Sequence, residues 1–185
     1  QSITEPQYVV TGSPTGGNEF GDIQSAIDAA EAGAVIGIDG SFAPSLESQI
    51  NVDVADVTLT GFNGTPTIDL TAANPSGNSA GAVQISASGV TLRNFNIDYE
   101  ADANGIEAND AGLSDITVDG MRVRNTAAPS GQPAINFEKA ESVTVTNNVV
   151  SGAAIGTFFT TSNQNTSTIS NNYVDLNPNN ATVSS

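Results

Sequence analysis

The sequence predicts an all-β protein of the solenoid type, a parallel β-helix. One short phrase recurs along the 185 residues, for example as VTLTGFN from Val57 and as VTVTNNVV from Val143. Within each phrase, apolar residues alternate with polar ones, which is typical of a half-buried strand. A repeat period in this range indicates that each repeat buries its apolar face against its neighbours. The second-place threonine occurs at Thr58, Thr91, Thr117, Thr144 and Thr168, in steps of 33, 26, 27 and 24 residues.

Each repeat is predicted to hold three short strands. The strand over the phrase should end at a glycine or asparagine, because both residues tolerate the left-handed backbone conformation that a bend needs. A second strand follows the bend, and a third precedes the phrase. Such strands, stacked in parallel, predict about six or seven coils spaced about 4.8 Å apart. The predicted bends are Gly61, Asn94, Gly120, Asn147 and Asn171, and the predicted preceding strands are 67–70, 82–85, 105–108, 134–137 and 154–159.

Residues at equivalent places in successive coils should form ladders inside the solenoid. Directly after each predicted bend stands an aromatic residue, a methionine or an asparagine. The apolar members should stack in the core, and the asparagines should continue the stack as a ladder of hydrogen-bonded amides. The members of this predicted stack are Phe62, Phe95, Met121, Asn148 and Asn172.

The N-terminal part differs from the repeats and predicts a cap. Ile23, Ile27 and Ala30 share one face at helical spacing, and Gly33 is a natural helix stop. An amphipathic helix here would cover the open end of the first coil. We expect one β-helix domain over 1–185, with an N-terminal segment and first strand over 1–19, the capping helix over 20–33 and the coils over 34–185.

No similar cap is apparent after the last predicted strand, so we expect an uncovered final coil. The N-terminal segment QSITEPQYVV is a candidate to add a strand to such an open edge of a neighbouring molecule.

The order of these segments resembles a known superfamily. YVV, then IQSAIDAAEAGAVIGIDGSF, then the threonine-centred coils, is similar to the right-handed parallel β-helix of the pectin-lyase-like superfamily. The resemblance covers nearly the whole chain and implies a right-handed coil. It implies no single activity, because that superfamily includes lyases, hydrolases, epimerases, phage spikes and adhesins.

The charge balance excludes some partners. Twenty acidic residues against four basic ones give a net charge of −16, which disfavours nucleic acid and anionic membranes as partners. The acidic excess predicts a high-salt habitat, where salt screens the repulsion. From Ser142 to Ser185 the only charged side chain is Asp175, which suggests that a partner, a further domain or glycan covers this part. No apolar run approaches the about 20 residues that span a bilayer.

The sequence offers no assembled catalytic group. There is no histidine, which removes the commonest general base and the Ser-His-Asp class, and there is no cysteine for thiol chemistry. Alignment of the coils places Arg93 beside Asp119 and Asp98 beside Arg124 in adjacent turns, so we expect two structural ion pairs. A glycosidase that uses two carboxylates remains open among twenty acidic residues.

Two kinds of ligand or modification site are predicted. Glu100, Asp102, Asn104 and Asp110 lie in a stretch that begins like a calcium loop, although the twelfth place, where a glutamate is expected, is Ala111. A long acidic surface loop is the simpler interpretation of this stretch. We expect no cofactor other than calcium bound at this stretch. Three sequons predict glycosylation acceptors in a secreted protein, at Asn63, Asn165 and Asn180.

Two functions are compatible with these features. The favoured one is an extracellular, non-enzymatic structural protein, a β-helical surface or filament-type subunit that assembles through its charge-poor C-terminal coils. The alternative is a secreted protein that binds or degrades polysaccharide. The first predicts self-association or a cell-surface partner, and the second predicts a glycan in a groove along the coils.

Overall fold

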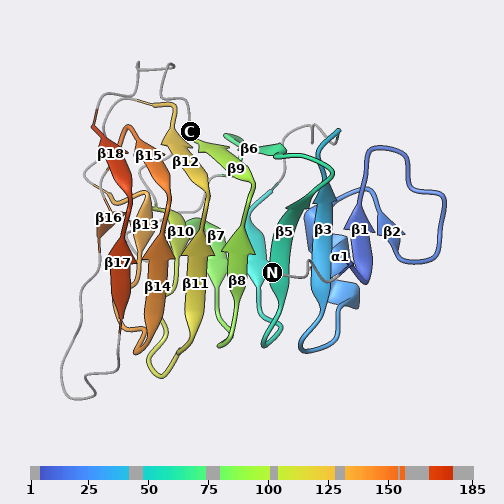
Figure 1. Ribbon diagram of the computed structural model, residues 1–185, viewed down its shortest axis with the longest axis horizontal. Helices are drawn as coiled ribbons and strands as arrows, with labels where there is room; N and C mark the ends of the chain where they lie inside the picture. The colour runs from blue at the N-terminus through green and yellow to red at the C-terminus, as the bar shows by residue number, and fades with distance from the viewer. Residues whose placement is uncertain are drawn as a thin grey trace.

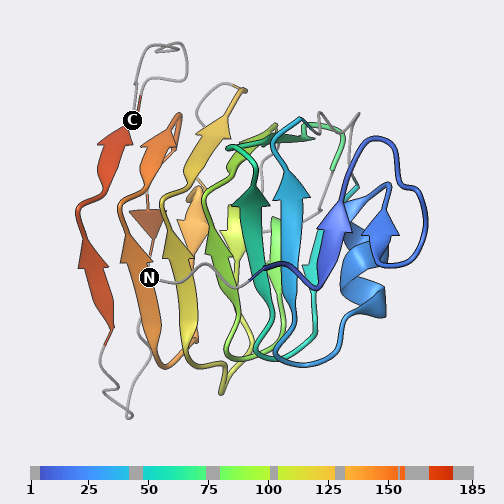
Figure 2. The same cartoon turned by 45° about the vertical axis from the view of Figure 1, so that its right-hand side comes forward.

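The chain forms a parallel β-solenoid, seen in a computed structural model (Figure 1). Its strands run up one face, cross over the top and return behind, and each coil lies beside the previous one in a right-handed progression (Figures 1 and 2). This confirms the predicted fold class. The structure describes residues 5–41, 48–73, 80–100, 104–127, 132–153, 155–156 and 167–176.

Three parallel sheets, named A, B and C here, make up the walls. Sheet A has the order β17-β14-β11-β8-β5-β3-β1-β2, and sheets B and C have five strands each. Sheet A contains β1 Tyr8–Val10, β2 Glu19–Phe20, β3 Val35–Asp39, β5 Thr58–Phe62, β8 Thr91–Arg93, β11 Ile116–Asp119, β14 Val143–Thr146 and β17 Thr168–Ser170. Sheet B contains β4 Ile50–Val52, β7 Gly81–Ile85, β10 Asn104–Glu107, β13 Ile135–Asn136 and β16 Ile155–Gly156. Sheet C contains β6 Thr67–Leu70, β9 Asn96–Tyr99, β12 Arg122–Asn125, β15 Val149–Ser151 and β18 Tyr173–Asp175.

The described strands form five complete coils rather than six or seven, because sheets B and C have five strands each. The range 67–70, predicted to precede a phrase, is β6 of sheet C and follows a bend instead. The strand of sheet B in that coil is β4, Ile50–Val52, which the repeat pattern did not reveal.

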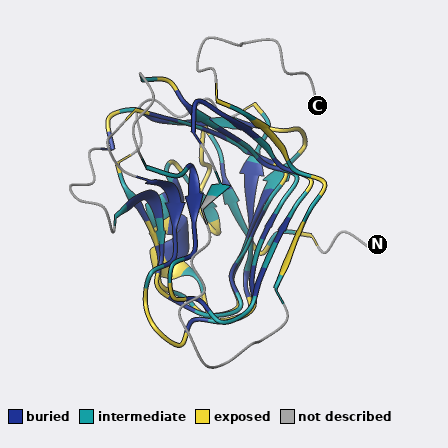
Figure 3. Ribbon diagram, turned by 90° about the vertical axis from the view of Figure 1, so that its left-hand side faces the viewer, coloured by how far each residue is buried: buried dark blue, intermediate teal, exposed yellow. Residues whose placement is uncertain are grey.

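Rows of aliphatic side chains fill the space between the sheets. In sheet A, Ile36, Leu59, Leu92, Val118 and Val145 are register partners from coil to coil, and each is at most 1% exposed. Viewed along the axis, the buried strands surround one continuous interior (Figure 3). Burial of each such side chain stabilises the fold by about 1.5–3 kcal/mol, so the core is a sum of similar steps.

The bends from sheet A to sheet C use left-handed residues, as predicted, at Asn94, Gly120, Asn147 and Asn171. The prediction for Gly61 was wrong. Gly61 lies inside the longer strand β5, and the left-handed residue of that coil is Asn63, with φ 54°. Gly61 is needed for a different reason, because a Cβ there would overlap the backbone carbonyl oxygen of Asn94 in the next coil.

The interior stack after the bends is present in part. Phe95 and Met121 are buried, and Asn148 continues the stack. The Asn148 amide donates to Asn172 Oδ1 at 3.0 Å and to the Val118 carbonyl at 2.9 Å, and its oxygen accepts from the Met121 N–H at 2.9 Å. The amide ladder is thus confirmed.

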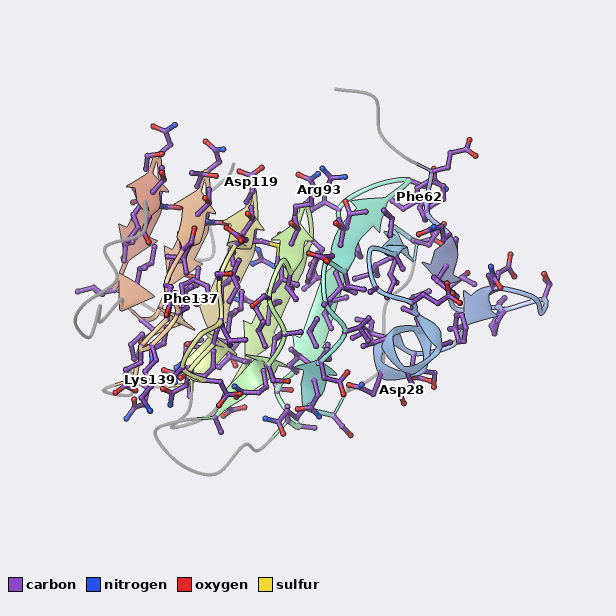
Figure 4. The ribbon with its side chains drawn as sticks, turned by 90° about the horizontal axis from the view of Figure 1, so that it is seen from below. Asp28, Phe62, Arg93, Asp119, Phe137 and Lys139 are labelled. Atoms are coloured by element: carbon purple, nitrogen blue, oxygen red, sulfur yellow. The ribbon has the colours of Figure 1, made fainter. Side chains whose placement is uncertain are left out.

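Phe62, the predicted first member of the stack, is not part of the core. It is the last residue of β5 and only partly buried, and Figure 4 shows it near the N-terminal strands. The two extra residues of β5 place Phe62 in the register of Asp39 on strand β3, which explains the difference.

The capping helix α1 spans Ile23–Ala29 and begins at the N-cap Asp22, whose side chain accepts from the Ser25 N–H. Ile23, Ala26 and Ile27 are buried where α1 packs on β1, β2, β3 and β4. The helix therefore covers the first coil, as predicted. Tyr8–Val10 is already used as β1, paired with β2 and β3, so the prediction that this stretch is free to add to a neighbour was wrong.

Within the described part of the chain, α1 has seven residues, and no helix has the length and apolarity needed to cross a bilayer.

Candidate functional site

Two places on the solenoid are candidates for function, and the first is the outer row of sheet B. We use this name for Asn51, Gln84, Glu107 and Asn136, which are register partners in four successive coils. Asn51 is exposed between the buried Ile50 and Val52, which shows that the row alternates with the core-facing residues of the sheet. All four side chains end in an amide or a carboxylate, so the row offers both hydrogen-bond donors and acceptors.

Glu107 is the unusual member of this row because its side chain is completely buried. Its carboxylate accepts from the Asn104 amide on the same strand and from Asn136 Nδ2, 3.3 Å away, on the next coil. Burial raises the pKa of Glu107 to about 7, with a smaller contribution from the nearby charge of Glu138. Lys139 and the two amides act in the opposite direction. We call Asn104, Glu107 and Asn136 the Glu107 cluster.

The sequence pattern did not identify Glu107 as a site residue. The one available signal was that the predicted strand 105–108 carries a carboxylate where the aligned strands carry Gln84 and Asn136. Its burial, and the contact across coils, depend on the register of β10 and β13 and are therefore visible only in the folded chain.

The calcium site predicted from the sequence stays a prediction. Glu100 and Asp110 are exposed, and Asp102 lies outside the described residues. Asn104 is buried in β10, and its amide donates to Glu107. The described residues contain no group of three or more acidic side chains placed to hold a metal ion.

Of the two ion pairs expected on sheets A and C, one forms. Arg124 contacts Asp98 at 2.5 Å, and Arg122 reaches the same carboxylate at 3.5 Å. Arg93 and Asp119 are register partners, and Figure 4 places both along one outer side, but no ion pair joins them within 4.0 Å. Asp119 Oδ1 instead accepts from Thr146 Oγ1 and Asn147 Nδ2, both at 2.7 Å.

The second candidate place is the last coil, which we define as β16, β17 and β18. Its side chains continue the core rows, with Ile169 following Val145 and Val174 following Val150. These two core-row residues are nevertheless 46% and 42% exposed, whereas Val145 and Val150 are fully buried. Tyr173 and Leu176, at 53% and 64%, are exposed beside them. Among the described residues, the end of the apolar core at β17 and β18 is thus partly exposed to solvent.

One predicted glycosylation acceptor falls in the described part. Asn63 is exposed on a bend, together with Gly64 and Thr65 of its sequon, and its Nδ2 lies 3.4 Å from Asp39 Oδ2. The acceptors Asn165 and Asn180 lie outside the described residues.

Fold and surface together define the class of the protein as an acidic parallel β-solenoid with a helical cap over its first coil. No family model matches the chain, and no curated protein and no solved structure matches it significantly. The resemblance to the pectin-lyase-like superfamily therefore goes no further than the shared solenoid architecture.

Proposed function

We propose that this protein is an extracellular, non-enzymatic structural protein, a β-helical surface or filament-type subunit that associates through its charge-poor C-terminal coils. The observation that carries the proposal is the exposure of Ile169, Tyr173, Val174 and Leu176 on the last coil. Ile169 and Val174 lie in core rows, and Tyr173 and Leu176 are exposed beside them. Complete burial of such a side chain is worth about 1.5–3 kcal/mol, and a partner that covers the surface still exposed would add a part of this for each.

The strand edges of the last coil support the same proposal. β17 and β18 are the terminal strands of sheets A and C in the described part of the chain. A terminal strand presents unpaired backbone N–H and C=O groups, which favour pairing with another chain. At the opposite end, α1 covers the first coil, and the edge strand β2 has only two residues, one of them Glu19. Association is therefore expected at one end of the solenoid.

Charge also favours contact at this end. The chain has a net charge of −16, yet Asp175 is the only charged residue from Ser142 onward. Two copies that meet through the last coil avoid most of the repulsion that two acidic surfaces would experience elsewhere. The exposed sequon at Asn63 supports an extracellular site of action, because glycosylation occurs on secreted chains.

Two added charges on the last coil test the proposal. In the double variant Tyr173→Asp and Leu176→Asp, we expect the association of this 18.7 kDa chain to be lost, since a charge buried in an apolar contact is strongly unfavourable. Sedimentation velocity over a wide concentration range at high salt measures the mass of each variant.

The matched control is Ala55→Asp with Ala111→Asp, which adds the same charge at two exposed turn residues on other coils. The control should associate like the unmodified chain. A monomer at every concentration for the unmodified chain, or equal association of both variants, would contradict the proposal.

A second candidate function, binding or degradation of polysaccharide, is favoured by the outer row of sheet B. Its accessible members, the exposed Asn51 and the half-buried Gln84, lie on adjacent coils about 4.8 Å apart and offer amide groups to the hydroxyls of a sugar chain, whereas Glu107 and Asn136 are buried.

Binding and hydrolysis assays on neutral and anionic polysaccharides, each with calcium and with a chelator, test this second function. If the outer row acts on glycans, the unmodified chain should bind or cleave at least one polymer, and Gln84→Ala should weaken binding. A flat result over the whole panel would remove this candidate and leave the assembly proposal unaffected.

A further inference from the structure

The carboxylate of Glu107 is buried without an opposite charge. Glu107 has no exposed surface, and its side chain accepts hydrogen bonds from the amides of Asn104 and Asn136. A carboxyl group that accepts at both oxygens fits the ionised form. Both ion pairs among the described residues involve Asp98, and neither involves Glu107. An ionised carboxylate in such a place is strongly unfavourable unless a cation neutralises it.

Two amide oxygens beside Glu107 also lack a partner. Asn136, the register partner of Glu107 on β13, is 5% exposed, and its Nδ2 donates to Glu107 Oε1 at 3.3 Å. The Oδ1 of the same amide group is buried and accepts no hydrogen bond among the described residues. Asn109 Oδ1, two residues after Glu107, is buried in the same way. Buried acceptors are nearly always paired, so these two oxygens point to a bound group.

The pairing of these two coils continues past the ends of β10 and β13. The Ala108 N–H donates to the Asn136 carbonyl at 3.0 Å. Ala108 and Phe137 are fully buried in the core, and Figure 4 shows Phe137 between the sheets. Because side chains alternate along paired segments, Asn109 and Glu138 lie on the outer side of sheet B.

Four residues of two neighbouring coils thus form one group rich in oxygen, which we name the sheet B acceptor group: Glu107, Asn109, Asn136 and Glu138. Burial and then the charge of Glu138 raise the pKa of Glu107, which agrees with a short distance between the two carboxylates. Glu138 makes no hydrogen bond or ion pair among the described residues. Lys139 lies at the outer surface in Figure 4 and makes no ion pair within 4.0 Å in the same part of the chain. Asn109 and Glu138 are half-buried, so the group can be reached from solvent.

We propose that the sheet B acceptor group is a calcium site that joins the coils of β10 and β13. Its ligands are the two carboxylates and the two amide oxygens, and water completes the coordination. Calcium takes about six to eight oxygen ligands of these kinds, whereas magnesium demands a near-ideal octahedron and gives up its water reluctantly. None of the four residues of the calcium loop predicted from the sequence supplies a ligand. This inference is independent of association through the last coil.

Isothermal titration calorimetry with calcium chloride tests the site in the whole chain, after a chelating resin has removed bound cations. Sodium chloride at about 1 M shortens the screening length to about 3 Å and suppresses the general attraction of cations to an acidic surface. We expect one calcium ion per chain, bound at least about tenfold more tightly than magnesium. Equal affinity for both ions, or no calcium binding, would overturn the proposal.

Two glutamine variants test the ligands. Glu107→Gln keeps the size of the side chain and removes its charge, and it should lower the calcium affinity at least about tenfold, because the charge of the ligands sets the affinity. Glu138→Gln should have a similar effect, and it alters a half-buried residue outside the core, so it decides the matter should Glu107→Gln fail to fold. Undiminished affinity in either folded variant would overturn the proposal.

The matched control is Glu100→Gln with Asp110→Asn, which removes two exposed carboxylates of the predicted calcium loop. This control should bind calcium like the unmodified chain. Loss of binding in the control would place the ion in the loop and overturn the site proposed on sheet B.

Hydrogen–deuterium exchange locates the ion in the fold. Calcium should slow the exchange of amides in β10 and β13 of the unmodified chain, whereas amides of β11 and β14 in sheet A should change much less. In Glu107→Gln or Glu138→Gln the same calcium concentration should have little effect. Equal protection of both sheets, or none, would contradict a site that joins these two coils.

Discussion

Asparagine serves two purposes at the bends between sheet A and sheet C. At Asn94, Asn147 and Asn171 the backbone is left-handed, with φ between 56° and 58°, a conformation that asparagine adopts more readily than most residues. One position later, Asn148 and Asn172 turn inward and satisfy backbone groups of the previous coil. The first use concerns the backbone, and the second concerns the side-chain amide.

These two uses predict that substitution of the inward asparagine lowers the free energy of unfolding more than substitution of the asparagine at the bend. Asn148→Ala removes the acceptor of the buried Met121 N–H and the donor to the Val118 carbonyl, and each buried group left unpaired costs about 1–3 kcal/mol. We expect the free energy of unfolding to fall by about 2–4 kcal/mol. Equilibrium denaturation in urea measures it.

Asn171→Gly is the matched control, because glycine adopts the left-handed conformation without cost and Asn171 is exposed. Its effect should stay within about 0.5 kcal/mol. Equal losses in both variants would show that the amide ladder contributes little beyond the bend itself.

At the scale of elements, the repeat phrase predicted β8, β11 and β14 of sheet A well because each of them alternates strictly between core and surface. The coil that contains β5 departs from the pattern. β5 is two residues longer than the phrase suggested. The bend therefore lies at Asn63 and not at Gly61, and Phe62 is not part of the interior stack. Sequence spacing alone does not show how far a strand continues, since that depends on its register with β3 and β8.

The candidate sites likewise include one that the sequence predicted and one that only the folded chain shows. An open end of the core was expected from the absence of a cap pattern, and among the described residues Val174 and Ile169 are partly exposed at that end. Glu107 was not expected, because its importance arises from burial and from Asn136, 29 residues away. The ion pair of Asp98 with Arg124 was predicted from the alignment of the coils. The alignment did not show that Asp119 would accept hydrogen bonds from Thr146 and Asn147 instead of pairing with Arg93.

For the whole molecule, the dominant feature is the density of negative charge on a short solenoid. Parallel stacking places like charges in neighbouring coils, as with Asp69 and Asp98, which are register partners. Arg122 and Arg124 compensate Asp98, but the four basic residues leave most of the twenty acidic ones without an opposite charge. Such repulsion opposes the compact state, and salt screens it.

We therefore expect the melting temperature to rise with salt. Between 0.1 M and 1 M sodium chloride the screening length falls from about 10 Å to about 3 Å, which covers the distance between neighbouring coils. A gain of about 2 kcal/mol would raise the melting temperature by roughly 4–8 °C for a chain of this size. Near pH 4.1, where the net charge is close to zero, the same salt step should have little effect, and this comparison separates screening from a general action of salt on apolar surface. An equal rise at pH 4.1 and at pH 8 would assign the stabilisation to the apolar core and not to relief of charge repulsion.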